Sequence, residues 1–341
     1  MKSIGSVLFP VGIFISALLP FLMPNYLTLL AYIWVMILLA LSWDIVGGQM
    51  GYNSFGNIVF FGIGMYVCAV VQRDMFSAGI DKFATITDQS EVAMTTSEYF
   101  ISLASGTLLG AIIAVILAII LGSGILGMRG HYFAICTLGL GIAAGEIASG
   151  IDYIGAGSGM VTPIYPETAG NKETFYYYFF FIFTVFTYFL LKKVYASRFG
   201  LAINAIRDDE DKAEAMGLHT TKYKIVAWAL SAFFVSITGA GVGNLIGFID
   251  PIDVAFAGAT FGVWMILMAI LGGKGTLWGP IIGALIFYIT KELFWTYLLG
   301  WQRVALGLLI VIIVVFFPTG ILGWIKTRWP DEKDQETEDK A

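Results

Sequence analysis

The sequence has few of the residues that usually build catalytic or metal sites. Its 341 residues include only two histidines and two cysteines, and only 13% are charged. His131 and His219 are too far apart in the chain to form a metal-binding pair on one helix. The phosphate-binding pattern G-x-x-x-x-G-K-S/T is also absent. We therefore expect no enzyme activity, no catalytic or metal-binding residues and no cofactor held by this chain.

Apolar residues dominate the rest of the sequence. Hydrophobic side chains make up 58% of the chain and the mean hydropathy is +0.83, which is too apolar for a soluble globular domain. Cys68 and Cys136 lie inside apolar runs, where we expect small buried side chains rather than a disulfide. We predict an all-α integral membrane protein, a polytopic helical bundle of about 8 to 10 transmembrane helices, some of them short or broken. The expected spans are residues 1–23, 26–46, 55–71, 100–121, 131–149, 175–191, 225–248, 256–271, 277–297 and 304–317.

These spans form one transmembrane domain, 1–325, followed by a charged and disordered tail, 326–341. The positive-inside rule places the side richer in Lys and Arg in the cytoplasm, with both termini there. That side holds Lys2, Arg129, Lys192, Lys193, Arg198, Arg207, Lys212, Lys222, Lys224, Lys274, Lys326, Arg328, Lys333 and Lys340, against Arg73, Lys82, Lys172, Lys291 and Arg303 on the other. Because the basic residues follow membrane topology, we expect no nucleic-acid partner.

The longest charged interruption between apolar segments is Ser197 to Gly217. Its composition favours a helix that ends at Gly217, and Asp208 is expected to cap a second short helix. Ala202, Ala205, Ile206, Ala213 and Met216 recur at helical spacing. A short helix tethered between two spans has little of its own loop to pack against, so we expect this stripe to dock on another protein. A solvated loop helix without a partner is the alternative.

Two glycine-rich stretches, Gly47 to Ser54 and Leu271 to Gly275, fall where apolar segments break. Broken helices expose backbone groups, which membranes tolerate only in protein interiors or beside water-filled cavities, and their ends can bind a zwitterionic substrate. An ordinary cytoplasmic turn is the alternative. The candidate residues for a substrate path are Gly51, Tyr52, Asn53, Ser54, Gly272 and Gly273, together with Ser158 in the loop 150–174.

Asp44 and Glu146 are ionisable residues inside predicted spans. Each would cost about 2.5 to 3.5 kcal/mol at the centre of a membrane helix, so each should face the bundle interior or lie near an interface. They either line the substrate path or pair with other polar groups. Lys291 and Glu292 lie near a span end, where they can reach the interface.

Four separated motifs resemble one family. Ser197-Arg198-Phe199-Gly200, Ala205-Ile206-Arg207 and Ala213-Glu214-Ala215-Met216-Gly217 look like the cytoplasmic EAA-type coupling loop of ABC-importer permeases, here about residues 195–224. The stretches 51–66, 129–138 and 271–283 are similar to permeases of branched-chain amino acid ABC transporters, in particular the larger of the two permease types. The resemblance extends over roughly residues 35 to 320. It implies that Arg198, Gly200, Arg207, Ala213, Glu214, Ala215 and Gly217 couple the chain to an ATPase.

The resemblance also implies the partners and the cargo. Such a subunit works in a bacterial or archaeal cytoplasmic membrane with two ATPase subunits that use the ATP, a second permease subunit and an extracytoplasmic solute-binding protein. It moves leucine, isoleucine and valine into the cytoplasm. Asn57 stands where the family usually has histidine, which leaves urea or a short amide open as the cargo. Two different functions also stay open: an ion-coupled secondary transporter with Asp44 and Glu146 as ion ligands, and a membrane enzyme.

Overall fold

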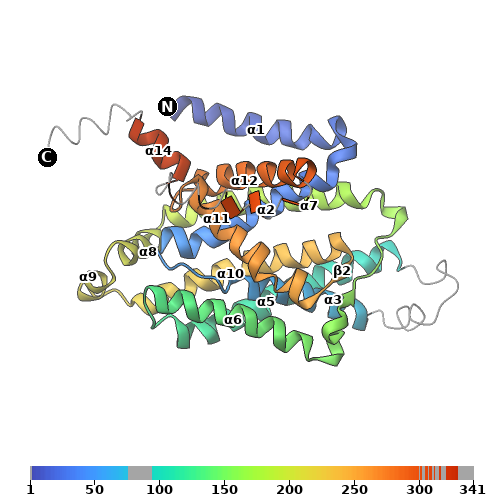
Figure 1. Ribbon diagram of the computed structural model, residues 1–341, viewed down its shortest axis with the longest axis horizontal. Coiled ribbons are helices and arrows are strands. Elements are labelled where there is room, and N and C mark those ends of the chain that lie inside the picture. The colour runs from blue at the N-terminus through green and yellow to red at the C-terminus, as the bar shows by residue number, and fades with distance from the viewer. Residues whose placement is uncertain are drawn as a thin grey trace.

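The computed structural model describes residues 2–75, 94–298, 300–301, 304–305, 307–308, 311, 315 and 320–328. Most of these residues lie in helices that run roughly along the long axis of Figure 1. The α-helices are α1 (Lys2–Leu22), α2 (Leu27–Asp44), α3 (Asn57–Met75), α5 (Thr96–Ile125), α6 (His131–Ser149), α7 (Lys172–Tyr195), α8 (Arg198–Asp208), α9 (Glu210–Ala215), α10 (Thr220–Ile246), α11 (Val263–Gly272), α12 (Trp278–Tyr297) and α14 (Gly320–Arg328). Within the described ranges the β structure is limited to the antiparallel pair β1 (Met160–Val161) and β2 (Phe248–Ile249).

Short 3-10 and π-helical segments connect or interrupt these helices. The 3-10 segments are η1 (Pro24–Tyr26), η4 (Asp152–Ile154), η5 (Ala156–Ser158) and η6 (Glu167–Ala169). The π-helical segments are η2 (Ile45–Gln49), η7 (Pro251–Ala255) and η8 (Gly258–Gly262). The π segments end α2 and precede α11, so two membrane helices are irregular at defined places.

Seven helical stretches in the described part of the chain are long and apolar enough to cross a membrane. They are Pro24–Gln49, Asn57–Met75, Thr96–Ile125, His131–Ser149, Lys172–Tyr195, Thr220–Ile246 and Pro251–Gly272. Two further helices, α1 and α12, have 21 and 20 residues. The prediction of an all-α polytopic membrane protein is confirmed.

Some of the predictions fall on residues beyond the described ranges. Most of the expected span 304–317, the tail residues 329–341, and the basic residues Lys82 and Arg303 lie outside the described residues. α14 crosses the predicted domain boundary, because residues 326–328 are its last residues. The boundary predicted after residue 325 therefore falls within α14, and the disordered tail stays a prediction.

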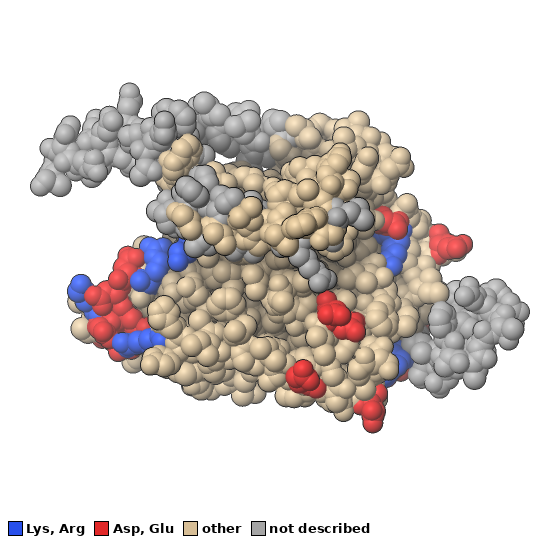
Figure 2. Space-filling model, in the orientation of Figure 1, with Lys and Arg blue, Asp and Glu red and all other residues tan. Residues whose placement is uncertain are grey.

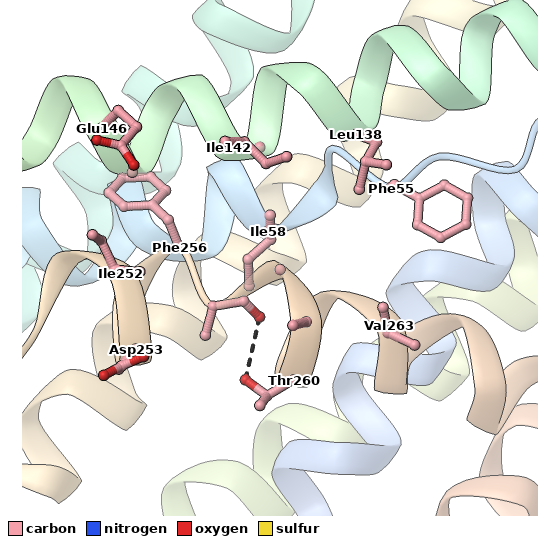
Figure 3. Close-up of a pocket in the computed structure, with 15 residues that line it drawn as sticks. Phe55, Ile58, Leu138, Ile142, Glu146, Ile252, Asp253, Phe256, Thr260 and Val263 are labelled. Carbon is pink, nitrogen blue, oxygen red and sulfur yellow. Dashed lines mark hydrogen bonds between the residues drawn. The ribbon is translucent and has the colours of Figure 1, made fainter. Parts of the chain in front are cut away.

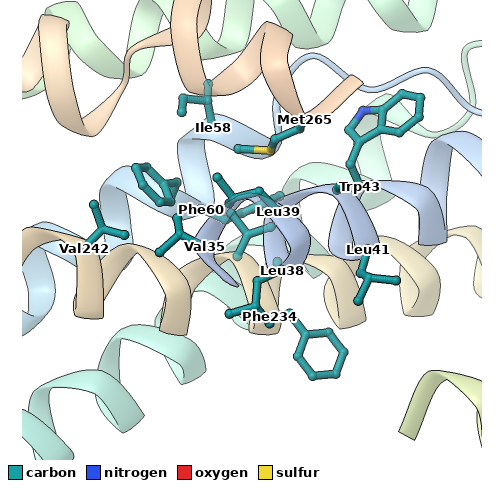
Figure 4. Packing of buried hydrophobic residues seen from close by; sticks show 14 of the residues in the cluster. Val35, Leu38, Leu39, Leu41, Trp43, Ile58, Phe60, Phe234, Val242 and Met265 are labelled. Carbon is teal, nitrogen blue, oxygen red and sulfur yellow. The ribbon is translucent and has the colours of Figure 1, made fainter. Parts of the chain in front are cut away.

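Helix α2 lies in the middle of the bundle. Every residue from Val35 to Met50 is buried, and α2 contacts α7, α10, α11 and α12. A helix that is apolar on all sides buries its whole surface in this way. Figure 4 shows its side chains Val35, Leu38 and Leu39 among residues of α3, α10 and α11.

Helices α3 and α10 approach each other through small residues. A Cβ atom on Gly64 would lie 1.9 Å from the backbone oxygen of Ser236, and one on Gly239 would lie 2.1 Å from that of Phe61. No side chain fits at either position unless the helices separate. Such contacts let membrane helices associate by close van der Waals packing.

Charged residues lie toward both ends of the bundle (Figure 2). Figure 2 shows Lys and Arg beside Asp and Glu at the left of this face, where Figure 1 places α8 and α9, next to a broad band of other residues. The η2 segment, the α5–α6 turn and the α11–α12 turn lie at this same end, and the η1 turn, η4 to η6 and β2 lie at the opposite end. Successive long helices therefore alternate in direction, as expected for a chain that crosses a membrane repeatedly.

Candidate functional site

The polar stretch after α7 folds into two short helices, α8 and α9. The Ser197 side chain caps α8 by accepting a hydrogen bond from the Phe199 N–H at 3.2 Å. Asp209, rather than the predicted Asp208, caps α9 by accepting from the Lys212 N–H at 3.0 Å. Gly217 follows α9 with a φ of +86°, which explains why a glycine stands there. The predicted helical segment and its glycine stop are confirmed.

The apolar stripe of this segment mostly faces the permease itself. Ala202, Ile206 and Ala213 are buried, whereas Met216 is 85% exposed. The expectation that the whole stripe is free to dock was wrong, because α7 and α10 lie close enough to cover it. The surface left open at this end is formed by Arg198, Leu201, Arg207, Glu214, Ala215, Met216 and Gly217.

The remaining coupling candidates have structural contacts. A Cβ atom on Gly200 would lie 2.2 Å from the Tyr195 backbone oxygen, so the α7–α8 connection requires a small residue. The Arg207 guanidinium pairs with Asp208 at 3.0 Å, and its aliphatic part lies against Gly51. Gly51 itself has a φ of +82°. Arg207 therefore lies between the open surface and the break after α2.

A cluster of charged and polar side chains, here called the Lys224 cluster, lies directly beneath α9. Lys224 is 1% exposed, and its ammonium group donates to Glu210 at 2.7 Å, to the Leu126 carbonyl oxygen at 2.6 Å and to the Tyr52 hydroxyl at 3.1 Å. The Tyr52 hydroxyl donates to the second oxygen of Glu210. Two buried donors thus hold one carboxylate at the base of α9.

Arg129 extends the Lys224 cluster to the surface. Its guanidinium lies 3.5 Å from Glu210 and 3.5 Å from Glu214, and it also pairs with Asp211. Burial raises the pKa of Glu210, but the hydrogen bonds from Lys224 and Tyr52 and the nearby positive charges outweigh it, so the pKa is lowered. Burial and the hydrogen bond to Glu210 raise the pKa of Tyr52, which keeps its hydroxyl protonated as a donor.

The two predicted breaks meet at the α8–α9 end of the bundle. Asp44 is 1% exposed, and its side chain accepts a hydrogen bond from the Gly275 N–H at 2.8 Å. A Cβ atom on Gly48 would lie 1.8 Å from Asp44 Oδ1 and 2.4 Å from the Gly275 nitrogen. Asp44 therefore joins the end of α2 to the α11–α12 turn, which is the pairing role that its burial required.

A cavity of about 460 Å³ lies between α3, α6 and the segments η7 and η8. Its walls are mostly apolar, with Phe55, Ile58, Leu138, Ile142, Phe256 and Val263 among the lining residues. Figure 3 places Glu146 and Asp253 toward one end and Phe55 and Leu138 toward the other. The cavity thus has an acidic end and an apolar end, dimensions and chemistry that suit a small amphiphilic molecule.

The predicted path residues do not form one site. Glu146 lines the cavity, and Asp44, Gly51 and Tyr52 lie at the α8–α9 end. Ser54 is buried, Asn53 is exposed beside it, and Ser158 is exposed in η5 at the opposite end. Gly272 and Gly273 pack against the start of α12, where a Cβ atom on Gly272 would lie 1.7 Å from the Gly279 oxygen. Their assignment to a substrate path stays a prediction.

Three important features carry weak sequence signals. Lys224 is the second of two lysines at the start of an apolar helix, and Glu210 is one of several acids in a charged run. The irregular segment before α11 lies within an apolar stretch, and only Pro251, Asp253 and two glycines hint at it. Within the described residues, no group of three His, Cys, Asp or Glu side chains is arranged to hold a metal ion.

Comparisons with known proteins agree with the motifs. Residues 25–315 match the family described as the permease component of branched-chain amino acid transport systems. The chain is 22% identical to the high-affinity branched-chain amino acid transport system permease protein LivM of Salmonella typhimurium, over 84% of this chain and 68% of that protein. It is 26% identical to the probable branched-chain amino acid transport permease protein LivM of Methanocaldococcus jannaschii, over 84% of this chain and 89% of that protein.

A shorter similarity links the chain to a second permease type. It is 30% identical to the permease protein LivH of Escherichia coli, over 37% of this chain and 40% of that protein. No solved structure matches the chain. The family match spans nearly the whole of the described bundle, and LivM proteins are similar over most of the chain. The chain therefore belongs to the family of branched-chain amino acid transport system permease components.

Proposed function

We propose that this chain is a transmembrane subunit of an ATP-binding cassette importer that moves leucine, isoleucine and valine into the cytoplasm. The observation that carries the proposal is the family match over residues 25–315 in a chain that also presents an open polar surface beside α9. The relatives that are similar over most of the chain are LivM proteins of branched-chain amino acid transport systems, and their names support the cargo.

The α8–α9 end is the proposed cytoplasmic face. Arg129, Lys192, Lys193, Arg198, Arg207, Lys212 and Lys222 all belong to segments at this end, in accord with the positive-inside rule. Both chain ends then lie in the cytoplasm, since the start of α1 and α14 are on the same side of Figure 1. An ATPase binds the open surface, with Glu214, Ala215 and Gly217 at its centre.

The other partners follow from this orientation. A second permease subunit, related to this one as LivH proteins are, completes the pathway, and a second ATPase binds beneath it. A solute-binding protein docks on the opposite end and delivers the amino acid. ATP is bound and hydrolysed on the ATPase subunits, and closure of the ATPases shifts the permease pair between outward-open and inward-open states.

The cavity between α3, α6 and η7–η8 is the proposed place of substrate contact. Glu146 and Asp253 offer carboxylates for an α-ammonium group, and the walls formed by Ile58, Leu138 and Phe256 offer an apolar surface for a branched side chain. Urea has no apolar group and a short amide has only a small alkyl group to fill that end, so this cavity favours branched-chain amino acids.

Purification tests the subunit assignment. The tagged chain is extracted from its native membrane in mild detergent, and bound proteins are identified by mass spectrometry. We expect two ATP-binding proteins and a second permease. Recovery of the chain alone, with ion-driven uptake intact in vesicles without ATP, would instead establish a secondary transporter. A Glu146→Gln variant that keeps full leucine affinity would remove the cavity from the substrate path.

A further inference from the structure

The segment from Gly51 to Asn57 joins the coupling end of the protein to the cavity. Tyr52, at its beginning, belongs to the Lys224 cluster beneath α9. Phe55, near its end, lines the cavity, and Ile58 on the first turn of α3 does so too. We propose that Tyr52 is a positioning residue that transmits displacement of α9 to the cavity wall. The inference rests on the proposed function.

The first link is between α9 and Tyr52. Glu210 accepts hydrogen bonds from both Tyr52 and Lys224, and the Lys224 ammonium lies 4.8 Å from the centre of the Tyr52 ring. The ring also packs edge-on against Phe133 of α6 at 5.2 Å. Because Tyr52 is 8% exposed and held on three sides, α9 cannot shift relative to α10 without moving it or breaking these contacts.

The second link is between Tyr52 and the cavity. Residues 51–54 have no regular secondary structure, so the segment is a short irregular connection rather than an independent helix. The Ser54 carbonyl oxygen accepts from the Trp43 indole at 2.7 Å, and the Phe55 N–H donates to Thr137 on α6 at 3.1 Å. The connection is therefore fastened to α2 and α6 as it passes between them.

The third link fixes the start of α3. The Asn57 side chain donates to Ser231 at 2.9 Å and accepts from the Trp228 indole at 3.0 Å, both on α10. The Ser54 hydroxyl also donates to Asn57 at 2.9 Å. Lys224, Trp228 and Ser231 thus hold both ends of the segment on one helix. A displacement of α9 that is passed to α10 therefore reaches Phe55 and Ile58 through these contacts, which extend over about two turns of α10.

The test measures leucine taken up per ATP hydrolysed by the whole complex in proteoliposomes. Tyr52→Phe removes the hydroxyl that contacts Glu210 and Lys224 but keeps the ring on Phe133. Tyr223→Phe is the matched control: it is next to Lys224, its ring packs on Phe199 at 5.8 Å, and its hydroxyl makes no hydrogen bond among the described residues. We expect Tyr52→Phe to keep most ATP hydrolysis and to lower uptake per ATP by about fivefold or more, with Tyr223→Phe unchanged.

A double-mutant cycle tests whether Tyr52 and Glu210 act through the same link. Glu210→Gln keeps the shape of the side chain, and combined with Tyr52→Phe it should lower uptake per ATP no further than either change alone, because both break one link. The inference is wrong if the unaltered complex transports leucine and uptake per ATP hydrolysed is unchanged in Tyr52→Phe and in Glu210→Gln. Equal falls in uptake and ATP hydrolysis count as this outcome. If the unaltered complex shows no ATP-driven uptake, the proposed function itself fails.

Discussion

Removal of Glu210 should strongly destabilise the protein because it leaves a buried positive charge. In Glu210→Leu, the Lys224 ammonium keeps only the Leu126 carbonyl oxygen and the Tyr52 hydroxyl as partners and stays almost fully buried. Breaking a buried ion pair from one side typically costs about 3 to 5 kcal/mol. We expect the free energy of unfolding, measured by SDS titration in mixed micelles with helical circular dichroism as readout, to fall by about 3 kcal/mol or more.

A double variant provides the internal check. Glu210→Leu with Lys224→Met removes both charges together and should recover most of that loss, because two apolar side chains replace the pair. Lys212→Met is the matched control, since the Lys212–Asp209 pair is at the surface and 84% of the Lys212 side chain is exposed. It should leave unfolding unchanged. If Glu210→Leu is as stable as the unaltered chain, Lys224 is not buried as a charged group.

Four further outcomes follow from the same contacts. Gly239→Leu should destabilise the bundle by about 1 to 3 kcal/mol or more in the same titration, because its side chain would meet the Phe61 backbone, whereas a stable variant would show that α3 and α10 are further apart. Gly217→Trp should insert normally but lose uptake, because its bulk would face the ATPase and a side chain at the φ of +86° strains the turn after α9; normal uptake contradicts a coupling role. Asp44→Asn should retain uptake that does not depend on an ion gradient, because an amide oxygen can still accept a hydrogen bond from the Gly275 N–H. If the unaltered protein shows ion-driven uptake and the variant loses it, Asp44 is an ion ligand. Since the fold lowers the pKa of Glu210 from 4.5, this group stabilises the protein at higher pH and loses its contribution as pH falls through that lowered pKa, so unfolding of Glu210→Gln should depend less on pH below about 4.5.

The helices of this protein are largely predictable because lipid imposes a simple rule on composition. Runs of apolar residues near the required length become spans, and those from 26 to 297 coincide with observed helices within several residues. The turns with glycine are predictable for a similar reason, as Gly217 illustrates: a positive φ excludes most other residues.

The arrangement of polar side chains is much less predictable. The stripe of α8 and α9 gives the period of a helix but not the direction in which it points, and Ile206 and Ala213 turned inward. Lys224 gives no sign in the sequence that its partner is Glu210, because the pair depends on how α9 folds back on α10. The irregular segment at Pro251 to Gly262 depends on packing against α3 and α6, which periodicity within one segment does not describe.

Uptake by the reconstituted complex tests the central claim most directly. The chain, purified with its partners, is placed in proteoliposomes with radiolabelled leucine and binding protein on one side and ATP on the other. We predict uptake that requires hydrolysable ATP, persists when ion gradients are collapsed, and is inhibited by isoleucine and valine but not by urea. Leucine uptake driven by a proton or sodium gradient without ATP would contradict the account.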